Sequence, residues 1–273
     1  MGFIRGGLLV IVGIFLFLSL LLGSIFLVLS WSLQYENVQE ELGPILKNLT
    51  EDKFSLIEEN FNLTEEMEEA REFMDEHCQN ESSYVFAEGG YTFVIPCDIL
   101  DEIEESPSAL IDQGIENIIE QIYYDNYDCG FWNCFEETGL PLFLVSEKAK
   151  NYWQEKFYFT LIAFAVIVVL IFFLVEHKRN TPIIVGATIV LSSLPLLWLE
   201  KIIGSSIAGD SYVAFVGIFF SKIGGVFWLI FFFGLIIMGA GIALRFLHKD
   251  VIKKKFSKRD VQKIFKKSSE KKK

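Results

Sequence analysis

Residues 8 to 31 read LLVIVGIFLFLSLLLGSIFLVLSW and contain no charged side chain. At a rise of about 1.5 Å per residue, a helix of this length exceeds the hydrocarbon core of a bilayer, which is about 30 Å thick. Arg5 precedes the run, so a cleaved signal peptide is the competing interpretation. The run is too long for a signal peptide and no A-x-A cleavage site follows it, which favours an uncleaved signal anchor.

Three further apolar runs follow the same pattern and have no Asp or Glu in their interiors. We therefore predict a membrane α-helical fold class with four transmembrane helices and a mostly helical α+β extracytoplasmic domain inserted between helices 1 and 2. The predicted segments are an N-terminus (1–7), helix 1 (8–31), the inserted domain (32–155), helix 2 (156–176), helix 3 (182–200), a short segment (201–221), helix 4 (222–246) and a tail (247–273).

The positions of Lys and Arg predict the orientation of the chain. Arg5 precedes the first span, Lys178 and Arg179 follow the second, and a basic stretch from Arg245 follows the fourth. Cytoplasmic segments next to spans are enriched in Lys and Arg. We therefore expect a multi-pass protein of the cell membrane with both termini cytoplasmic and residues 32–155 outside.

The charged residues are segregated along the chain. Residues 34–153 hold 29 of the 36 acidic residues and five basic ones, a net charge of −24. Residues 245–273 hold 13 basic and three acidic residues, a net charge of +10. Together with a mean hydropathy of +0.38, this pattern excludes a disordered protein and an ordinary cytosolic enzyme. The acidic segment repels nucleic acid, so we expect no nucleic-acid partner.

The inserted domain shows helical periods around one β-hairpin. Apolar residues at helical spacing predict helices over Val38 to Leu49, around Met67 to Met74, and over Leu110 to Ile122 after Ser106-Pro107. The segments SYVFAE and YTFVIP flank Gly89-Gly90 and predict a hairpin. Ser146 is placed to start a helix that continues into the second span, with Tyr152, Trp153 and Tyr158 at the membrane interface.

All four cysteines lie in this domain: Cys78, Cys97, Cys129 and Cys134. An even number in an outer compartment indicates two disulfides, whereas a zinc site would need ligand spacing such as C-x-x-C, which is absent. Three pairings are open. Proximity in the sequence favours Cys78 with Cys97 and Cys129 with Cys134.

Three Asn-x-Ser/Thr sequences also lie in this domain, at Asn48, Asn62 and Asn80. They have the form of glycosylation acceptors and would make the protein a glycoprotein.

The residues needed for catalysis are not grouped in one compartment. His77 belongs to the predicted outer domain, whereas His177 and His248 lie on the opposite side, and no hydrolase, zinc-protease or nucleotide-binding motif is present. The glutamates between Glu65 and Glu72 cover several helix faces, as expected for a solvated surface, and Asp125, Asn126 and Asp128 lack the spacing of a calcium loop. We expect no enzyme, no catalytic or metal-binding residue and no cofactor.

Residues 201–221 are too apolar for a solvated loop and are interrupted by Gly204, Gly209 and Asp210. They form either an interfacial or a re-entrant segment. Gly217, Ser221 and Gly225 recur every four residues, a spacing that favours a helix-packing face over a pore loop. Lys222 is expected to extend its amine to the outer interface. A pore, if present, would use hydroxyls from Ser205, Ser206, Ser211 and Ser221.

Residues 247–267 mix apolar side chains with lysines. This composition is typical of a basic helix on an anionic inner leaflet, and equally of a solvated tail that only fixes the topology. The residues predicted to contact the membrane surface are Lys253, Lys254, Lys255, Phe256, Lys263, Phe265, Lys266 and Lys267.

These observations favour a non-enzymatic envelope protein that recognises or assembles with a protein partner through its outer domain. The alternative is an oligomeric channel or small-solute permease subunit that uses residues 202–246. Membrane lipids are expected partners in both cases, and both are compatible with a homo-oligomer.

Overall fold

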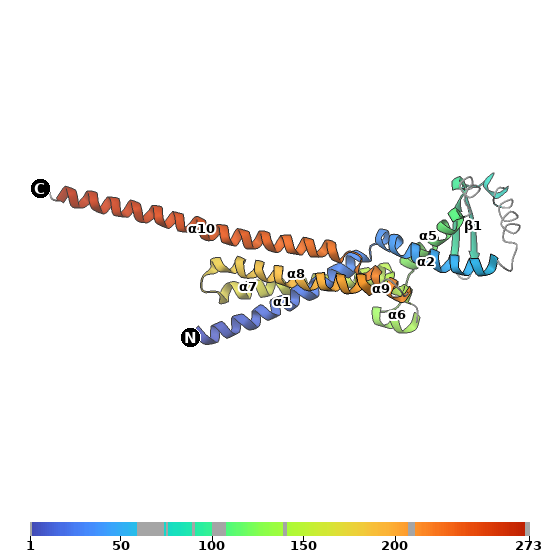
Figure 1. Ribbon diagram of the computed structural model, residues 1–273, viewed down its shortest axis with the longest axis horizontal. Coiled ribbons are helices and arrows are strands. Elements are labelled where there is room, and N and C mark those ends of the chain that lie inside the picture. Colours follow the sequence, from blue (N-terminus) through green and yellow to red (C-terminus); the bar gives the residue numbers. More distant parts are fainter. Residues whose placement is uncertain are drawn as a thin grey trace. The chain divides into compact units, whose positions relative to one another are not determined.

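The computed structural model is mostly helical, and it describes residues 2–58, 74, 76–88, 91–99, 108–138, 141–206 and 211–270. The elements are α1 (Gly2–Ser32), α2 (Tyr35–Glu58), β1 (Ser83–Glu88), β2 (Tyr91–Pro96), η1 (Cys97–Ile99), α5 (Ser108–Tyr124), α6 (Phe131–Thr138), η2 (Pro141–Val145), α7 (Glu147–Leu174), η3 (Lys178–Asn180), α8 (Thr181–Ser206), α9 (Ser211–Phe220) and α10 (Ile223–Glu270). Figure 1 shows long helices and one small hairpin of strands, which lies beside α2 and α5.

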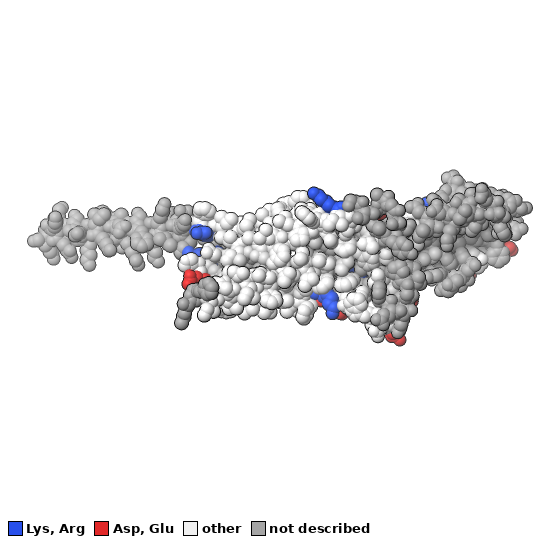
Figure 2. Space-filling view, turned by 60° about the horizontal axis from the view of Figure 1, so that its bottom comes forward, with Lys and Arg blue, Asp and Glu red and all other residues white. Residues whose placement is uncertain are grey.

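Four helical stretches among the described residues are long and apolar enough to cross a membrane, as the sequence predicts. They are Ile4–Ser32, Glu147–Leu174, Lys178–Ile203 and Phe215–Phe246. Figure 2 shows the result as a broad surface without blue or red side chains. Most apolar side chains of α7 are exposed, which suits a helix whose outer surface meets lipid.

The chain divides into two compact units. We name Met1–Ser24, Tyr158–Trp198 and Gly225–Lys273 the bundle unit, and Ile25–Phe157 with Leu199–Gly224 the head unit.

The core of the bundle unit joins α1, α7 and α8. Leu16 of α1 is fully buried in one apolar cluster with Ile171 of α7 and Ile189 of α8. The α1–α7 contact is tight because α1 carries a glycine there: a Cβ on Gly23 would lie 3.0 Å from the Thr160 hydroxyl.

Helices α8 and α10 approach each other through glycines. A Cβ on Gly186 would lie 2.5 Å from the backbone nitrogen of Met238, and Gly234 and Gly241 meet α8 at similarly short distances. The packing face predicted at Gly217, Ser221 and Gly225 is wrong for Gly225, because a Cβ there would meet nothing within 4 Å. Small residues are therefore used for close packing as expected, but at other positions.

The head unit is built from helices and one two-stranded sheet. Strands β1 and β2 are antiparallel, and Glu88 pairs with Tyr91, which leaves Gly89-Gly90 as a two-residue connection. The predicted hairpin is therefore confirmed. The described residues contain no further strand, so they support this one hairpin and not the α+β domain predicted for the region. Two strands form no sheet layer, and they are stabilised by packing against α5.

Helix α7 starts directly after Ser146 and is continuous into the apolar run, as predicted. Its first turn is capped, since the Ala149 amide donates to the Ser146 hydroxyl over 3.3 Å. Helix α10 has 48 residues, which corresponds to a length of about 72 Å. It continues without interruption beyond the span into the basic tail.

Candidate recognition surface

Helices α1 and α2 meet at a corner fixed by two side chains of the head unit. The Tyr123 hydroxyl, on α5, donates to the Leu33 carbonyl over 2.9 Å, and the Asn37 amide donates to the Trp31 carbonyl over 2.7 Å. The Trp31 carbonyl belongs to the last turn of α1 and also accepts from the Gln34 amide, whereas the Leu33 carbonyl directly follows the helix. Tyr123 is 2% exposed, so the corner is part of the core.

Helices α2 and α5 lie antiparallel and contact each other through polar side chains at their surface. Gln39 donates to Glu116 over 2.6 Å, and Lys47 forms an ion pair with Asp112 at 2.7 Å. Below them, Val38 and Leu42 of α2 pack with Ile119 of α5. The helical periods predicted for these segments therefore form the core of the head unit.

Two tyrosines at this corner, Tyr35 and Tyr123, have raised pKa values. Burial raises the pKa of Tyr123, and the negative charge of Glu147 adds to this effect. Burial also raises the pKa of Tyr35, with further contributions from Glu120 and Glu116. Both phenols therefore keep their protons to higher pH than an exposed tyrosine, and that of Tyr123 is donated to the Leu33 carbonyl.

The side-chain amide of Asn117, on α5, forms a hydrogen bond that holds the hairpin against this helix. The Asn117 side chain, 8% exposed, donates to the Val94 carbonyl of β2 over 2.8 Å and to the Gln113 carbonyl over 2.9 Å. Ile95 is buried against α5. A disulfide from Cys97, directly after β2, to Cys78 also anchors this strand, with a Cα–Cα distance of 5.6 Å.

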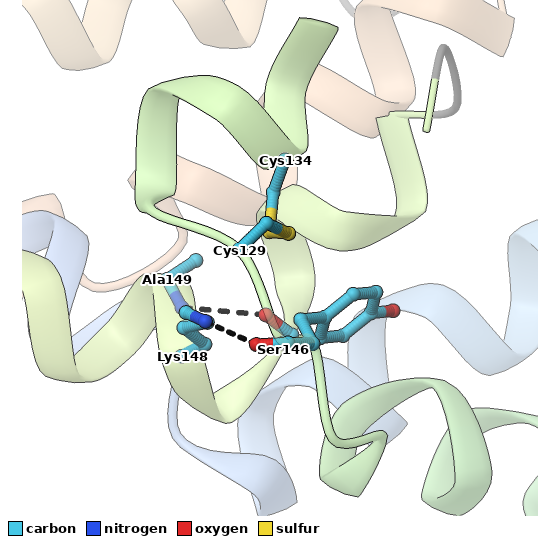
Figure 3. The surroundings of a disulfide bond; sticks show 6 residues. Cys129, Cys134, Ser146, Lys148 and Ala149 are labelled. Carbon is cyan, nitrogen blue, oxygen red and sulfur yellow. Dashed lines mark hydrogen bonds between the residues drawn. A yellow bond between two sulfur atoms is a disulfide. The ribbon is translucent and has the colours of Figure 1, made fainter. Parts of the chain in front are cut away.

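The second disulfide joins Cys129 to Cys134 across the start of α6, with a Cα–Cα distance of 5.3 Å. Figure 3 shows it beside Ser146 and Ala149, where α7 begins. Phe131 of α6 stacks on Tyr152 of α7 with ring centroids 4.1 Å apart, and Lys148 donates to the Tyr127 carbonyl. The pairing that the sequence favoured is the one present in the structure.

Some large apolar side chains of the head unit remain exposed. Val85 and Val94 face each other across the hairpin and are 53% and 38% exposed. They lie on the face opposite Ile95, because neighbouring residues of a strand point to opposite sides. Trp132 of α6 is 61% exposed. We name the Val85–Val94 pair the hairpin face.

The predicted glycosylation sites are only partly described. Asn80 lies in a turn and is exposed. Asn48 belongs to α2, with its side chain outside the described ones, and Asn62 lies outside the described residues.

Buried polar side chains in the described part of the chain are hydroxyls and one amide. The His77 ring packs edge-on against Tyr84, with ring centroids 5.3 Å apart. The described residues contain no group of three or more His, Cys, Asp or Glu that could hold a metal ion. Chemically, the head unit offers a contact surface and no reactive constellation within these residues.

Several hydroxyls of the apolar helices bond to the backbone of their own helix, whereas those of Thr181 and Ser221 are buried without a partner. Ser24 donates to the Leu20 carbonyl over 2.6 Å, Ser192 to Ile189 over 2.8 Å and Ser193 to Val190 over 2.8 Å. Such bonds within one helix satisfy the hydroxyls without lining a polar path.

Residues 211–220 form α9, which contributes Ile218 to the core of the head unit. Ser221 is partly buried, its hydroxyl without a partner, and Lys222 has its amine 3.9 Å from the Glu40 carboxylate. The side chains of Ser205, Ser206 and Ser211 lie outside the described ones.

The predicted membrane-contact residues of the tail, Lys253, Lys254, Lys255, Phe256, Lys263, Phe265, Lys266 and Lys267, all belong to the continuous helix α10, and their side chains lie outside the described ones.

Sequence reasoning missed the residues that organise the head unit, namely Tyr123 and Asn117. Their hydrogen-bond partners lie 90 and 23 residues away in the chain, and no local pattern marks such a contact.

Comparison with protein-family models, with curated proteins and with solved structures finds no match to this chain.

Proposed function

We propose that the protein is a multi-pass protein of the cell membrane whose head unit lies outside the cytoplasm and recognises or assembles with another protein by surface contact. The observation that carries this proposal is the hairpin face, an exposed apolar Val85–Val94 pair on a hairpin fixed from behind by Asn117 and the Cys78–Cys97 disulfide. A preorganised apolar surface loses little entropy on binding, which suits a recognition element.

The outward orientation has independent support. Arg5, Lys178 and Arg179 lie at one end of the first three spans, as expected for a cytoplasmic side. Both cysteine pairs belong to the head unit, and disulfides persist in oxidising compartments. In this proposal α1 is an uncleaved signal anchor, residues 32–155 form a mostly helical extracytoplasmic domain, and Asn80 is an exposed glycosylation acceptor.

The buried polar side chains among the described ones include no Asp, Glu, Lys, Arg or His, which supports a contact function over catalysis. An oligomeric channel or permease subunit built on residues 202–246 is the alternative, and it has less support. Gly186 and Gly234 bring α8 and α10 into backbone contact, which leaves no path between these two helices.

Site-specific photocrosslinking tests the recognition proposal. A benzophenone amino acid at Val85 or Val94 should give one discrete adduct with a partner protein in intact cells. The matched control is the same amino acid at Asn126, an exposed loop residue of the head unit. The adduct from position 85 should also disappear when Val94→Lys is introduced. Equal adducts at positions 85 and 126, or none at 85 and 94, would contradict the proposal.

A flux measurement separates the two functions. Purified protein in liposomes should pass neither ions nor small solutes if recognition is its role. Reproducible flux that is lost in a variant of α10, such as Gly234→Leu, would favour the channel instead.

A further inference from the structure

The bundle unit contains a cavity at the end where α1 begins and α7 ends. Its volume is about 340 Å³, within the range of small-molecule sites. Leu9 of α1, Leu174 of α7 and Ile184 of α8 provide an apolar wall. The cavity is open to the outside and is therefore accessible from the end of the bundle.

The remaining wall is polar and carries a guanidinium. Arg5 lines the cavity together with Glu176, His177 and Asn180. Its Nε donates to the Leu174 carbonyl over 2.6 Å and its Nη2 to the Phe173 carbonyl over 3.3 Å. A guanidinium has five N–H groups, so these two bonds fix its orientation and leave three donors for a ligand.

An anion in this cavity would bind to the Arg5 guanidinium. Among the lining residues, Arg5 is the one cationic side chain and Glu176 the one anionic side chain. Guanidinium groups bind phosphate through paired hydrogen bonds, and the His177 ring and the Asn180 amide can supply additional donors.

The position of the cavity distinguishes a lipid from a free ion. The spans begin at Ile4, end at Leu174 and begin again at Lys178, so the cavity lies at the boundary between the apolar core and water. Phospholipid phosphates lie at this depth. A free phosphate would have no use for the apolar wall, whereas a lipid places its phosphate on Arg5 and the start of its acyl chains along Leu9 and Ile184.

We propose that this cavity binds the headgroup of an anionic phospholipid from the adjacent leaflet, with Arg5 as the phosphate ligand and His177 and Asn180 as further donors. The role of Arg5 is then twofold: it caps α7 and holds the lipid. Under the proposed orientation this is the cytoplasmic leaflet, but the site itself does not depend on the function of the head unit.

Two neighbouring glycines provide a variant and its control that both keep the bonds from Arg5 to the last carbonyls of α7. Gly6 lines the cavity and has nothing within 4 Å of an added Cβ, so Gly6→Leu fills the cavity and leaves Arg5 in place. Gly7 also has open space around it but does not line the cavity, so Gly7→Leu is the matched control. Arg5→Gln and Arg179→Gln form a second pair, since both remove one charge and only Arg5 lines the cavity.

Binding of phosphatidylglycerol to the purified full chain, measured by native mass spectrometry in a neutral detergent, tests the proposal. Arg5→Gln should weaken binding by about tenfold or more, the effect of losing a charge-assisted hydrogen bond. Gly6→Leu should weaken it similarly because the added side chain occupies the cavity, while Gly7→Leu and Arg179→Gln should leave binding within about twofold. Phosphatidylcholine should bind more weakly. Wild-type affinity in Gly6→Leu, equal binding of both lipids, or displacement of the lipid by an equal concentration of inorganic phosphate would each overturn the proposal.

Discussion

Tyr123 is the residue on which the geometry of the head unit depends most. Its hydroxyl satisfies the Leu33 carbonyl at the corner between α1 and α2, in a site that water does not reach. Tyr123→Phe keeps the ring and removes this donor. A buried carbonyl without a partner costs about 1–3 kcal/mol, so we expect this loss in the free energy of unfolding, measured by denaturant titration in detergent.

Tyr124→Phe is the control for this substitution. Tyr124 neighbours Tyr123 and is 53% exposed, so removing its hydroxyl should change the stability by less than about 0.5 kcal/mol. Equal effects of the two substitutions would contradict the role of the Tyr123–Leu33 bond.

The raised pKa of Tyr123 predicts a pH dependence. In the unfolded chain a tyrosine loses its proton near pH 10, whereas the folded state holds this proton to higher pH. Above about pH 10 the folded state therefore binds more protons than the unfolded state, and stability falls as pH rises. Denaturant titrations from about pH 9 to 11 should show a steeper fall for the wild type than for Tyr123→Phe. Parallel curves would argue against a coupled titration.

Among the elements, α8 and α10 have the closest packing, and their glycines allow it. Gly186→Ala would place a methyl group 2.5 Å from the Met238 nitrogen and force the helices apart. Overpacking of this kind costs about 1–3 kcal/mol, so we expect a lower unfolding temperature in detergent. Gly239→Ala is the control, because open space surrounds this position in α10. Its stability should be unchanged or slightly higher, since alanine favours a helix more than glycine. An equal or larger loss in Gly239→Ala would contradict the role of the α8–α10 contact at Gly186.

The two disulfides constrain loops of different length. Cys78–Cys97 spans 19 residues and Cys129–Cys134 spans five. The entropy of the unfolded chain then predicts stabilisation of about 3 and 2 kcal/mol respectively. Replacing each pair by alanine should therefore destabilise the protein more for the first pair than for the second, as measured by denaturant titration. Non-reducing peptide mapping should find these two linkages, and a peptide linking Cys97 to Cys129 would contradict them.

The tail forms part of a helix that begins within an apolar stretch long enough to span a membrane. A basic helix on the inner leaflet would need a bend after Phe246, and α10 is continuous from Ile223 to Glu270. Positions 256 and 265 are nine residues apart, about two and a half turns, so they lie on opposite sides of a regular helix. Contact of the tail with anionic lipid therefore stays a prediction. It would act mainly through the lysines, and salt should release it.

Sequence periodicity predicted elements well where one face is buried. The apolar spacing from Leu110 to Ile122 became α5, with Ile115, Ile119 and Ile122 buried. The hairpin followed from its two glycines and β-branched strands. Pro44 lies inside α2, although a proline ordinarily argues against a helix interior, so this residue did not help to predict α2.

At the scale of the whole molecule, hydropathy and charge predicted the four apolar helices because a bilayer imposes strict length and charge requirements on a span. The cavity at Arg5 and the hairpin face could not be predicted in this way. Each depends on side chains from separate elements, and only the folded chain brings Arg5 to the end of α7 or turns Val85 and Val94 outward together.

The orientation of the head unit is the claim on which the recognition proposal, the disulfides and the glycosylation sites all depend. All four native cysteines are paired, so a single introduced cysteine can be labelled without background. Ser32 is unsuitable because it is fully buried, whereas Gln34 in the head unit and Arg179 between α7 and α8 are exposed.

The decisive measurement is labelling of Gln34→Cys and Arg179→Cys with a membrane-impermeant maleimide. We predict that intact cells label Gln34→Cys at once and label Arg179→Cys only after permeabilisation. The reverse pattern, or labelling of both sites in intact cells, would contradict a head unit held outside by four spans.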